Sequence, residues 1–326
     1  MKKPSAETAA SAPPRRESLF IGESEAMREA LGRLERAAAS EAPVFITGES
    51  GAGKELCARG LHGMSARADG PFIAVNCAAI ARDLAESEFF GHARGAFTGA
   101  LQARPGLVEM AHGGTLFLDE ICEMDLPLQG KLLRFLETGL VRPVGADREK
   151  RVDARIVCAT NRDPAREVRE GRFRADLFWR LHVLPIALPP LRARGGDILL
   201  LAEHFLARFA REEGRAPMTI SEEAAEMLLA HDWPGNVREL QNVLRQAVVF
   251  HHGAELTVSM LAGLMPATPA PAPQTAGRGL RLVEREAIEE AISHCGGSVP
   301  KAARMLGVAP STIYRKRRGW LRARAV

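Results

Sequence analysis

The segment from Gly48 to Glu55, GESGAGKE, constrains the fold more than any other part of the chain. It follows the apolar run Val44–Thr47 and opens a helical pattern over Lys54–His62. Glycines let a loop turn its backbone N–H groups toward phosphate oxygens, and the helix N-terminus adds a positive dipole end. Lys54 is placed to reach the β and γ phosphates. We expect a P-loop built from Gly48, Glu49, Ser50, Gly51, Ala52, Gly53, Lys54 and Glu55.

A second motif, GGTLFLDE, ends in two adjacent carboxylates, Asp119 and Glu120. An apolar strand would deliver them at its carboxyl end, where ligands bind in open α/β sheets. We interpret Asp119 as the residue that organises Mg²⁺, and Glu120 as the base that polarises water for attack on the γ-phosphate. The motif is weak alone, but about 60 residues after a P-loop it indicates an ATP-hydrolysing site. Glu55 departs from the general pattern, since a Ser or Thr usually holds magnesium there.

The order of elements predicts an α/β domain followed by a helical one. Apolar, β-rich runs alternate with helical patterns, which favours a mostly parallel sheet. The expected strands are Val44–Thr47, Phe72–Val75, Thr115–Leu118, Arg155–Thr160 and His182–Leu188. After Pro189 and Pro190 the strand signals stop. Helices are then expected over Asp197–Arg211, Ser221–Ala230 and Gly235–His251, the last of these closing the helical subdomain.

Four further polar residues each have two interpretations. Asn161 would orient the attacking water, although an isolated Asn at a strand end is more often a turn cap. Arg174 and Arg180 would stabilise transition-state charge in a neighbouring subunit. Taken alone, they are better explained as solvated arginines or as a partner of Asp176. Arg238, in the first turn after a Trp-Pro-Gly segment, would sense the nucleotide, and surface charge is its alternative.

The charge of the chain is concentrated in its tail. From Leu280 to Val326, ten basic residues stand against four acidic ones, whereas the rest of the chain has a net charge of −2. This asymmetry favours a polyanion partner, most simply nucleic acid. Residues 266–279 carry four prolines and predict a linker, and residues 1–17 predict a disordered leader.

Cysteine spacing and hydropathy exclude two other classes. The five cysteines lie far apart and form no CxxC pair, which indicates reduced thiols and a cytoplasmic location rather than a disulfide framework or a zinc site. No stretch approaches ~20 consecutive apolar residues, so we expect no membrane insertion.

The loop GAFTGA, from Gly95 to Ala100, is the motif that narrows the choice of protein family most. With it, the chain resembles the bacterial sigma-54-dependent transcription activators, which are AAA+ enhancer-binding proteins. The P-loop, Asn76, GGTLFLDE, ATNRD, FRADLFWRL and WPGNVREL follow in the family's order. The resemblance implies an AAA+ P-loop NTPase fold with a parallel sheet and a helical lid. It also implies that Gly95, Ala96, Phe97, Thr98, Gly99 and Ala100 contact sigma-54.

The same resemblance implies roles for single residues. Lys54 would bind phosphate, Asp119 would hold magnesium with ATP, and Asn76 would restrain Glu120. Asn161 would be the first sensor and Arg238 the second. The trans arginine fingers would be Arg174 and Arg180, which implies a hexameric ring. Glu55 is ordinary in this family, whereas Ala52 and Cys122 depart from the family pattern, which has Thr and Gly there.

The tail resembles a Fis-type helix-turn-helix, a small all-α domain. Leu282–His294 reads as a first helix, and Ser298 caps a second that runs to Leu306. A recognition helix begins at Pro310 or Ser311, since Pro suits a first helical turn. The residues expected to contact DNA are Ser311, Thr312, Tyr314, Arg315, Lys316, Arg317 and Arg318.

These interpretations predict a sigma-54-dependent activator. The expected domains are 18–190 (AAA+ α/β), 191–265 (AAA+ helical) and 280–326 (helix-turn-helix). The expected cofactors are ATP and Mg²⁺; the partners are sigma-54 RNA polymerase holoenzyme, upstream double-stranded DNA bound as dimers, and further copies in a ring. About 20 residues precede the ATPase domain, too few for a receiver domain, so control by a separate protein is expected. The alternatives are a regulator acting by DNA occupancy and a AAA+ remodeler of another client.

Overall fold

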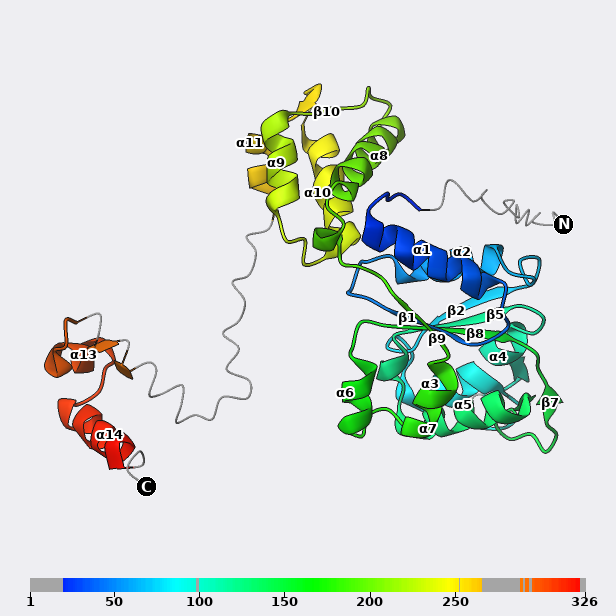
Figure 1. Ribbon diagram of the computed structural model, residues 1–326. Coiled ribbons are helices and arrows are strands. Elements are labelled where there is room, and N and C mark those ends of the chain that lie inside the picture. The colour runs from blue at the N-terminus through cyan, green and yellow to red at the C-terminus, as the bar shows by residue number, and fades with distance from the viewer. Residues whose placement is uncertain are drawn as a thin grey trace. The chain divides into compact units, whose positions relative to one another are not determined.

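The computed structural model describes residues 20–97, 100–251, 253–265, 288–289, 291–292 and 295–322. The predicted leader 1–17 and linker 266–279 lie outside these residues, as do Thr98 and Gly99. Most of the first helix predicted for the tail lies outside them as well. The chain divides into two units, Met1–Pro266 and Ala267–Val326 (Figure 1).

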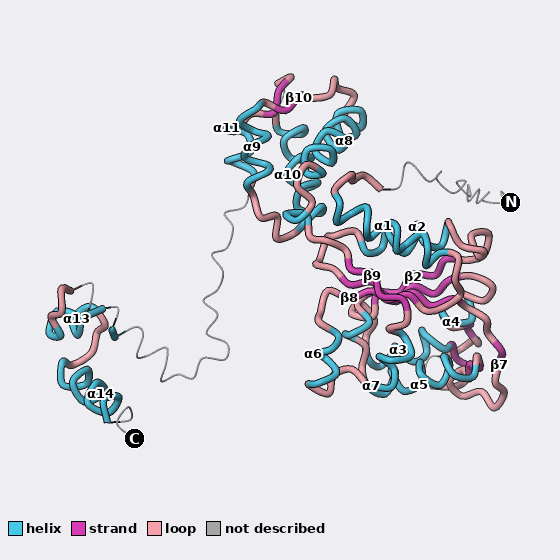
Figure 2. The backbone as a smooth tube through the Cα atoms, viewed as in Figure 1, coloured by secondary structure: helices cyan, strands magenta, loops and turns pink. Residues whose placement is uncertain are grey.

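A five-stranded parallel sheet lies at the centre of the first unit (Figure 2). Its order is β2 (Phe72–Asn76), β5 (Thr115–Asp119), β8 (Arg155–Thr160), β1 (Val44–Thr47) and β9 (Leu184–Ala187). All five strands predicted from the sequence are present. Parallel register places Asn76 opposite Asp119 and Thr47 opposite Thr160, so the carboxyl ends of the strands meet at one edge.

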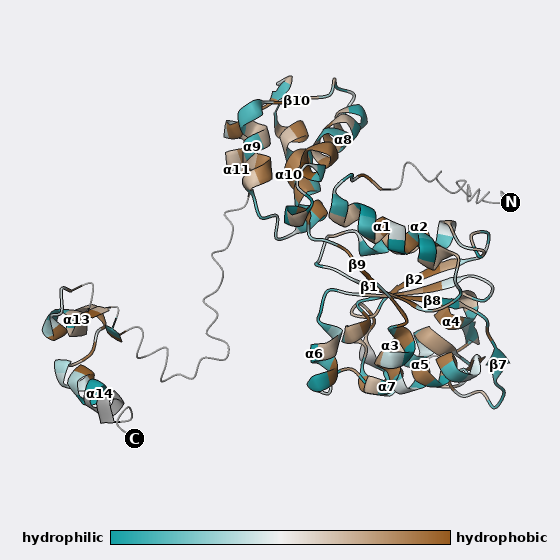
Figure 3. Cartoon of the chain, in the orientation of Figure 1, coloured by the Kyte–Doolittle hydropathy of each residue, from teal (hydrophilic) through white to brown (hydrophobic). Residues whose placement is uncertain are grey.

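Helices cover both faces of this sheet (Figure 1). On one face lie α1 (Glu25–Ala38) and α2 (Lys54–Gly63), packed on β1 and β8. The other face is covered by α3 (Arg82–Phe90), the short α4 (Leu107–Met110), α5 (Leu126–Thr138) and α7 (Ala175–Leu181), with α6 (Pro164–Arg169) beside them. The strands of the sheet are coloured mostly apolar (Figure 3), as expected for a sheet buried on both faces.

Four helices form the lid subdomain, which comprises α8 (Asp197–Glu212), α9 (Glu222–Ala230), α10 (Asn236–Phe250) and α11 (Val258–Leu264). Ser221 caps α9 through the N–H of Ala224, as its sequence indicates. The expectation that α10 closes the subdomain is wrong. The short strand pair β10 (Thr219–Ile220) and β11 (Glu255–Leu256) turns the chain back, and α11 buries Leu261 in the lid core.

Two short antiparallel pairs were not predicted from the sequence. They are β3 (Gly91–His92) with β4 (Arg104–Pro105), and β6 (Leu140–Val141) with β7 (Lys150–Arg151). Strands of two residues are too short to show an alternating hydrophobic pattern. The first pair forms the base of the loop that contains Gly95 and Ala100.

The second unit contains α13 (Val299–Met305) and α14 (Pro310–Arg322) in its described part. Both helices begin where the sequence predicts. Ser298 occupies the N-cap of α13, although its hydroxyl makes no capping hydrogen bond. Ile313 on α14 packs with Ala302 and Ala303 on α13. None of the helices described in either unit is long and apolar enough to cross a membrane.

Candidate functional site

The glycine-rich loop 48–53 joins β1 to α2 at the carboxyl edge of the sheet. Gly51 and Gly53 have φ of +77° and +100°, the left-handed region that favours glycine. A Cβ on Gly51 would lie 2.2 Å from the carbonyl oxygen of Gly235, so a larger residue does not fit there. Gly53 is the N-cap of α2, and the N-terminus of a helix attracts anions. The loop therefore has the geometry that a phosphate chain requires.

Lys54 lies buried beneath this loop. Its Nζ donates to the carbonyl oxygens of Gly48 and Glu49 at 2.9 and 3.3 Å, and lies 3.5 Å from Oε1 of Glu120. The side chain is only 7% exposed. A buried ammonium is costly unless anionic groups surround it, and phosphate oxygens would supply them. The position of Lys54 thus fits a bound nucleoside triphosphate.

Asp119 and Glu120 stand at the carboxyl end of β5, next to Lys54. Burial, followed by the nearby charge of Glu120, raises the pKa of Asp119, and Lys54 offsets this only in part. Glu120 has φ of +50° and donates its own N–H to Oδ1 of Asp119. Two crowded carboxylates fit a divalent cation, and carboxylate oxygens are the ligands that Mg²⁺ prefers.

The two asparagines of the predicted site lie on either side of these carboxylates. The backbone N–H of Asn161 donates to Oε2 of Glu120 at 3.0 Å. The side-chain oxygen of Asn76 accepts the N–H of Ala78 at 2.9 Å. Among the described residues, no hydrogen bond joins Asn76 to Glu120. The structure therefore brings both asparagines to the site and restrains Glu120 through Asn161 and Lys54.

Ala52 and Cys122, the two departures noted in the sequence, are both buried. The carbonyl oxygen of Ala52 accepts Nη2 of Arg194 at 2.9 Å. Cys122 lies two residues after Glu120, and burial raises the pKa of its thiol to about 11. The thiol is therefore neutral near pH 7 and adds no negative charge to the carboxylate pair.

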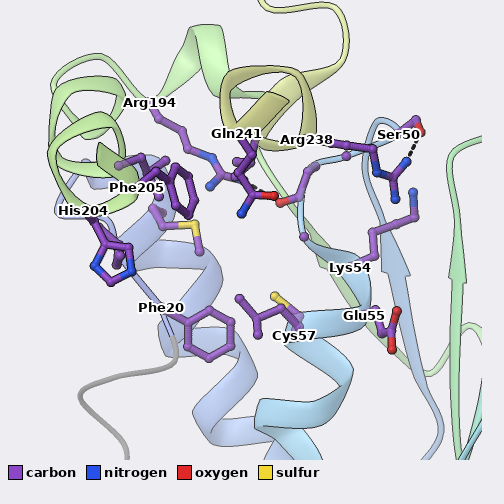
Figure 4. Close-up of a pocket in the computed structure, with 18 of the residues that line it drawn as sticks. Phe20, Ser50, Lys54, Glu55, Cys57, Arg194, His204, Phe205, Arg238 and Gln241 are labelled. Atoms are coloured by element: carbon purple, nitrogen blue, oxygen red, sulfur yellow. Dashed lines mark hydrogen bonds between the residues drawn. The ribbon is translucent and has the colours of Figure 1, made fainter. Parts of the chain in front are cut away.

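A cavity of about 600 Å³ opens beside the loop and the carboxylates (Figure 4). The P-loop forms one side, and the lid helices α8 and α10 supply Phe205 and Arg238 on the other. Arg238, predicted as a sensor, points to Oγ of Ser50 at 3.4 Å. The cavity extends to Phe20, beyond the phosphate-binding loop. Its polar and apolar ends fit a phosphate chain and an aromatic base.

Lid residues that the sequence did not indicate hold the P-loop in place. Asn236, fully buried with φ of +53°, donates its amide to Oε2 of Glu49 and to the carbonyl oxygen of Ser50, both at 3.0 Å. Glu49 also forms an ion pair with Arg192 at 2.6 Å. Hydrogen bonds from Arg192 and then Asn236 lower the pKa of Glu49, although burial alone would raise it. These contacts span more than 140 residues of sequence, and no local pattern announces them.

Arg174 and Arg180 lie apart from this cavity in the described chain. Arg174 forms a bidentate pair with Asp176 at 3.0 and 2.7 Å, which is the alternative that the sequence left open. Arg180 donates to the carbonyl oxygen of Leu136 at 3.1 Å. Its neighbour Trp179 is 72% exposed. Both arginines thus lie on the surface and do not line the cavity that contains Asp119 and Glu120.

The GAFTGA loop projects from the β3–β4 pair. The N–H of Gly95 donates to the carbonyl oxygen of Ala100 at 2.8 Å, which closes the base of the loop. Phe97 is 40% exposed, and its ring lies 5.0 Å from the His92 ring. Leu101, which directly follows the loop and which the sequence did not single out, is 83% exposed. The loop therefore presents apolar side chains to solvent.

The predicted recognition helix, α14, has one buried and one exposed face. Ile313 is fully buried, whereas Ser311, Tyr314, Arg315 and Arg317 are exposed. Thr312 and Lys316 are half-buried, and the side chain of Arg318 lies outside the described residues. The exposed face carries cations and hydrogen-bonding groups, which suits a nucleic-acid groove.

The sheet, the P-loop, the carboxylate pair and the helical lid define a AAA+ P-loop NTPase, and the second unit is a helix-turn-helix domain. Residues 20–187 match the sigma-54 interaction domain, 192–277 the AAA+ ATPase lid domain, and 279–320 the Fis family of bacterial regulatory proteins. The chain belongs to the sigma-54-dependent transcriptional activators.

Curated relatives and solved structures agree with this membership. The regulatory protein LuxO of Vibrio cholerae is 51% identical over 313 residues, covering 92% of this chain and 69% of the relative. The Nif-specific regulatory protein of Azotobacter vinelandii is 44% identical over 302 residues, covering 91% and 58%. NtrX from Brucella abortus, solved with ADP and with ATP, is 36% and 35% identical, with a TM-score of 0.70 in each case. These two structures cover 92% and 94% of this chain, and the chain covers 68% and 70% of theirs.

Proposed function

We propose that this activator hydrolyses ATP with Mg²⁺ and uses the reaction to remodel the closed complex of sigma-54 RNA polymerase into the open complex. The observation that carries the proposal is the joining of two features in one unit. Lys54, Asp119 and Glu120 meet at the carboxyl edge of the sheet, and the GAFTGA loop projects from the same domain. An occupancy regulator would need neither.

Within the site, we assign each residue a step. Lys54 leaves the carbonyl oxygens of Gly48 and Glu49 and binds the β and γ phosphates. Glu120 accepts a proton from water, whose oxygen attacks the γ-phosphorus while ADP departs. Asn161 and Lys54 orient the Glu120 carboxylate, and Asp119 holds Mg²⁺. When bound, that ion neutralises the charge that develops on the phosphate oxygens.

The surface position of Arg174 and Arg180 supports an assembly of several copies. Within one chain, both guanidinium groups lie away from the cavity, so they serve a site only if that site belongs to a neighbour. We assign them as arginine fingers in trans and propose a hexameric ring. Arg238, which lies against Ser50, is assigned as the sensor that links the nucleotide to the lid.

The loop and the tail supply the two macromolecular contacts. Phe97 and its neighbours in Gly95–Ala100 engage sigma-54, with Thr98 and Gly99 outside the described residues. The DNA-contacting set is Ser311, Thr312, Tyr314, Arg315, Lys316, Arg317 and Arg318. We propose that the tail binds an upstream site as a dimer, that the domain boundaries are those predicted from the sequence, and that a separate protein acting in trans controls the activator.

The experiment is single-round transcription from a supercoiled template that carries a sigma-54 promoter and an upstream site. Transcript is expected with ATP, and none with a nonhydrolysable analogue or with the Glu120→Gln variant. Equal amounts of transcript with ATP and with the analogue would overturn the proposal and favour a regulator that acts by DNA occupancy.

A further inference from the structure

A buried carboxylate, Glu167 on α6, ties together two segments that the proposed function uses separately. Its side chain is 5% exposed. It accepts Nε and Nη2 of Arg172 at 2.6 and 2.7 Å, and Nη1 of Arg162 at 3.2 Å. These hydrogen bonds, the one from Arg172 foremost, lower the pKa of Glu167 to about 2. The carboxylate is therefore ionised throughout the physiological range and holds both arginines.

A buried amide, Gln129 on α5, joins the same segment from the other side. Gln129 is fully buried. Its Nε2 donates to the carbonyl oxygens of Met124 and Arg172 at 2.7 and 2.9 Å. Its Oε1 accepts the backbone N–H of Arg174 at 2.9 Å. One side chain thus satisfies three backbone groups, two of them flanking Phe173.

Glu167 and Gln129 both connect this segment to the strand ends that carry Glu120 and Asn161 in the same subunit. Arg162 directly follows Asn161, whose N–H holds Glu120, and it also pairs with Glu123. Met124 lies on the turn that follows Glu120. The segment 172–174 is therefore tied to the end of β8 through Glu167 and to the end of β5 through Gln129. The backbone of Arg174 is fixed, while its guanidinium stays at the surface on Asp176.

We propose that Glu167 and Gln129 are positioning residues that set the Arg174 finger from the carboxylate edge of their own subunit. The inference rests on the proposed role of Arg174 in trans. It adds that the nucleotide site of each subunit positions the Arg174 that the same subunit inserts into the site of its neighbour. A charged group displaced by about 1 Å costs as much as 10²-fold in rate, so the orientation of this segment matters.

The experiment mixes two inactive variants of the full chain. Glu120→Gln lacks its base but offers Arg174, and Arg174→Ala lacks the Arg174 finger but keeps Glu120. We expect phosphate release to return on mixing, at interfaces where the donor's Arg174 meets the acceptor's Glu120. No recovery from this plain mixture would overturn the trans role itself, and with it the inference.

Glu167→Gln is then added to one partner at a time. On the donor, it should lower the recovered kcat about tenfold without changing KM for ATP, since only the finger is displaced. On the acceptor, from which Arg174 has been removed, it should change nothing. Full recovery with Glu167→Gln on the donor, or an equal loss on either partner, would overturn the positioning role.

Two further variants guard against a folding defect. Glu170→Gln is the matched control, because Glu170 pairs with Arg166 and Arg172 at the exposed surface, and we expect it to leave recovery unchanged. Arg172→Gln breaks the Glu167 pair from a side chain that is 47% exposed. It should reproduce the donor-only loss even if Glu167→Gln fails to fold, and equal recovery with it would contradict the inference.

Discussion

The backbone N–H of Asn161 holds the carboxylate of Glu120 at 3.0 Å, which joins the ends of two neighbouring strands, β8 and β5. On its other oxygen, Glu120 faces Nζ of Lys54 at 3.5 Å. The proposed base is thus fixed between a neutral donor and the proposed phosphate-binding cation. The backbone at the end of β8 is therefore in direct contact with the proposed base.

Replacing Glu120 by Gln should separate nucleotide binding from turnover. The amide keeps the size of the side chain but cannot accept the water proton, so phosphate release should fall about 10²- to 10⁴-fold. Affinity for a fluorescent ATP analogue should stay within a few fold. Near-normal hydrolysis by this variant would remove Glu120 as the base.

Asn236→Asp tests the contact between the lid and the P-loop. A carboxylate at this position would lose the donor to Glu49 and place two acids together in a buried site, costing about 1–3 kcal/mol of unfolding free energy. ATP should also raise the melting temperature less than in the wild type. Asn236→Gly, which keeps the left-handed backbone, serves as the comparison. An unchanged ATP-induced shift in both variants would dissociate Asn236 from nucleotide binding.

Phe97→Ala should uncouple hydrolysis from activation. The ring is partly exposed and makes no contact with the nucleotide cavity, so ATP turnover should remain near that of the wild type. In the presence of a transition-state analogue of ATP hydrolysis, the variant should no longer bind sigma-54. Phe250→Ala, at an aromatic residue of the lid that is 68% exposed, is the control and should bind normally. Retained sigma-54 binding by Phe97→Ala would contradict the loop assignment.

The buried thiols predict an alkaline instability. Burial raises the pKa of Cys57 to about 12 and that of Cys122 to about 11, against 9.0 for a solvated thiol. Above pH 9 the unfolded chain therefore loses protons that the folded chain keeps, so the free energy of unfolding falls as the pH rises. At pH 8.5, mass spectrometry should show iodoacetamide on the half-buried Cys295 and none on Cys57 or Cys122 until urea is added. Equal labelling of Cys57 and Cys122 with and without urea would refute their burial as the cause of the raised pKa.

Tyr314→Ala tests the recognition helix. Tyr314 is 56% exposed on the same helix as Arg315, so its loss should reduce discrimination between a specific site and random DNA by about 1–3 kcal/mol. Met305→Ala, at a residue of α13 that is 58% exposed, should leave discrimination intact. Competition binding at fixed salt measures both, and an equal loss for the two variants would argue against direct readout by Tyr314.

The sequence predicted the parts of the site that are local in the chain. The P-loop directly joins a strand to a helix, and the spacing of its glycines and Lys54 is recognisable in the sequence. Asn236 and Arg194 were missed, because their partners Glu49 and Ala52 lie more than 140 residues away. Gln129 was missed for the same reason, since its role depends on the packing of α5 against the segment that leads into α7. Long-range polar contacts leave no periodic pattern in sequence.

Promoter melting tests the central claim most directly. The protein is mixed with sigma-54 RNA polymerase on a supercoiled promoter that carries an upstream site, and start-site thymines are probed with permanganate. The account predicts reactive thymines with ATP and none with a nonhydrolysable analogue or with Phe97→Ala. Melting that proceeds equally with the analogue, or no melting with ATP while hydrolysis and DNA binding are intact, would contradict ATP-driven remodelling by this chain.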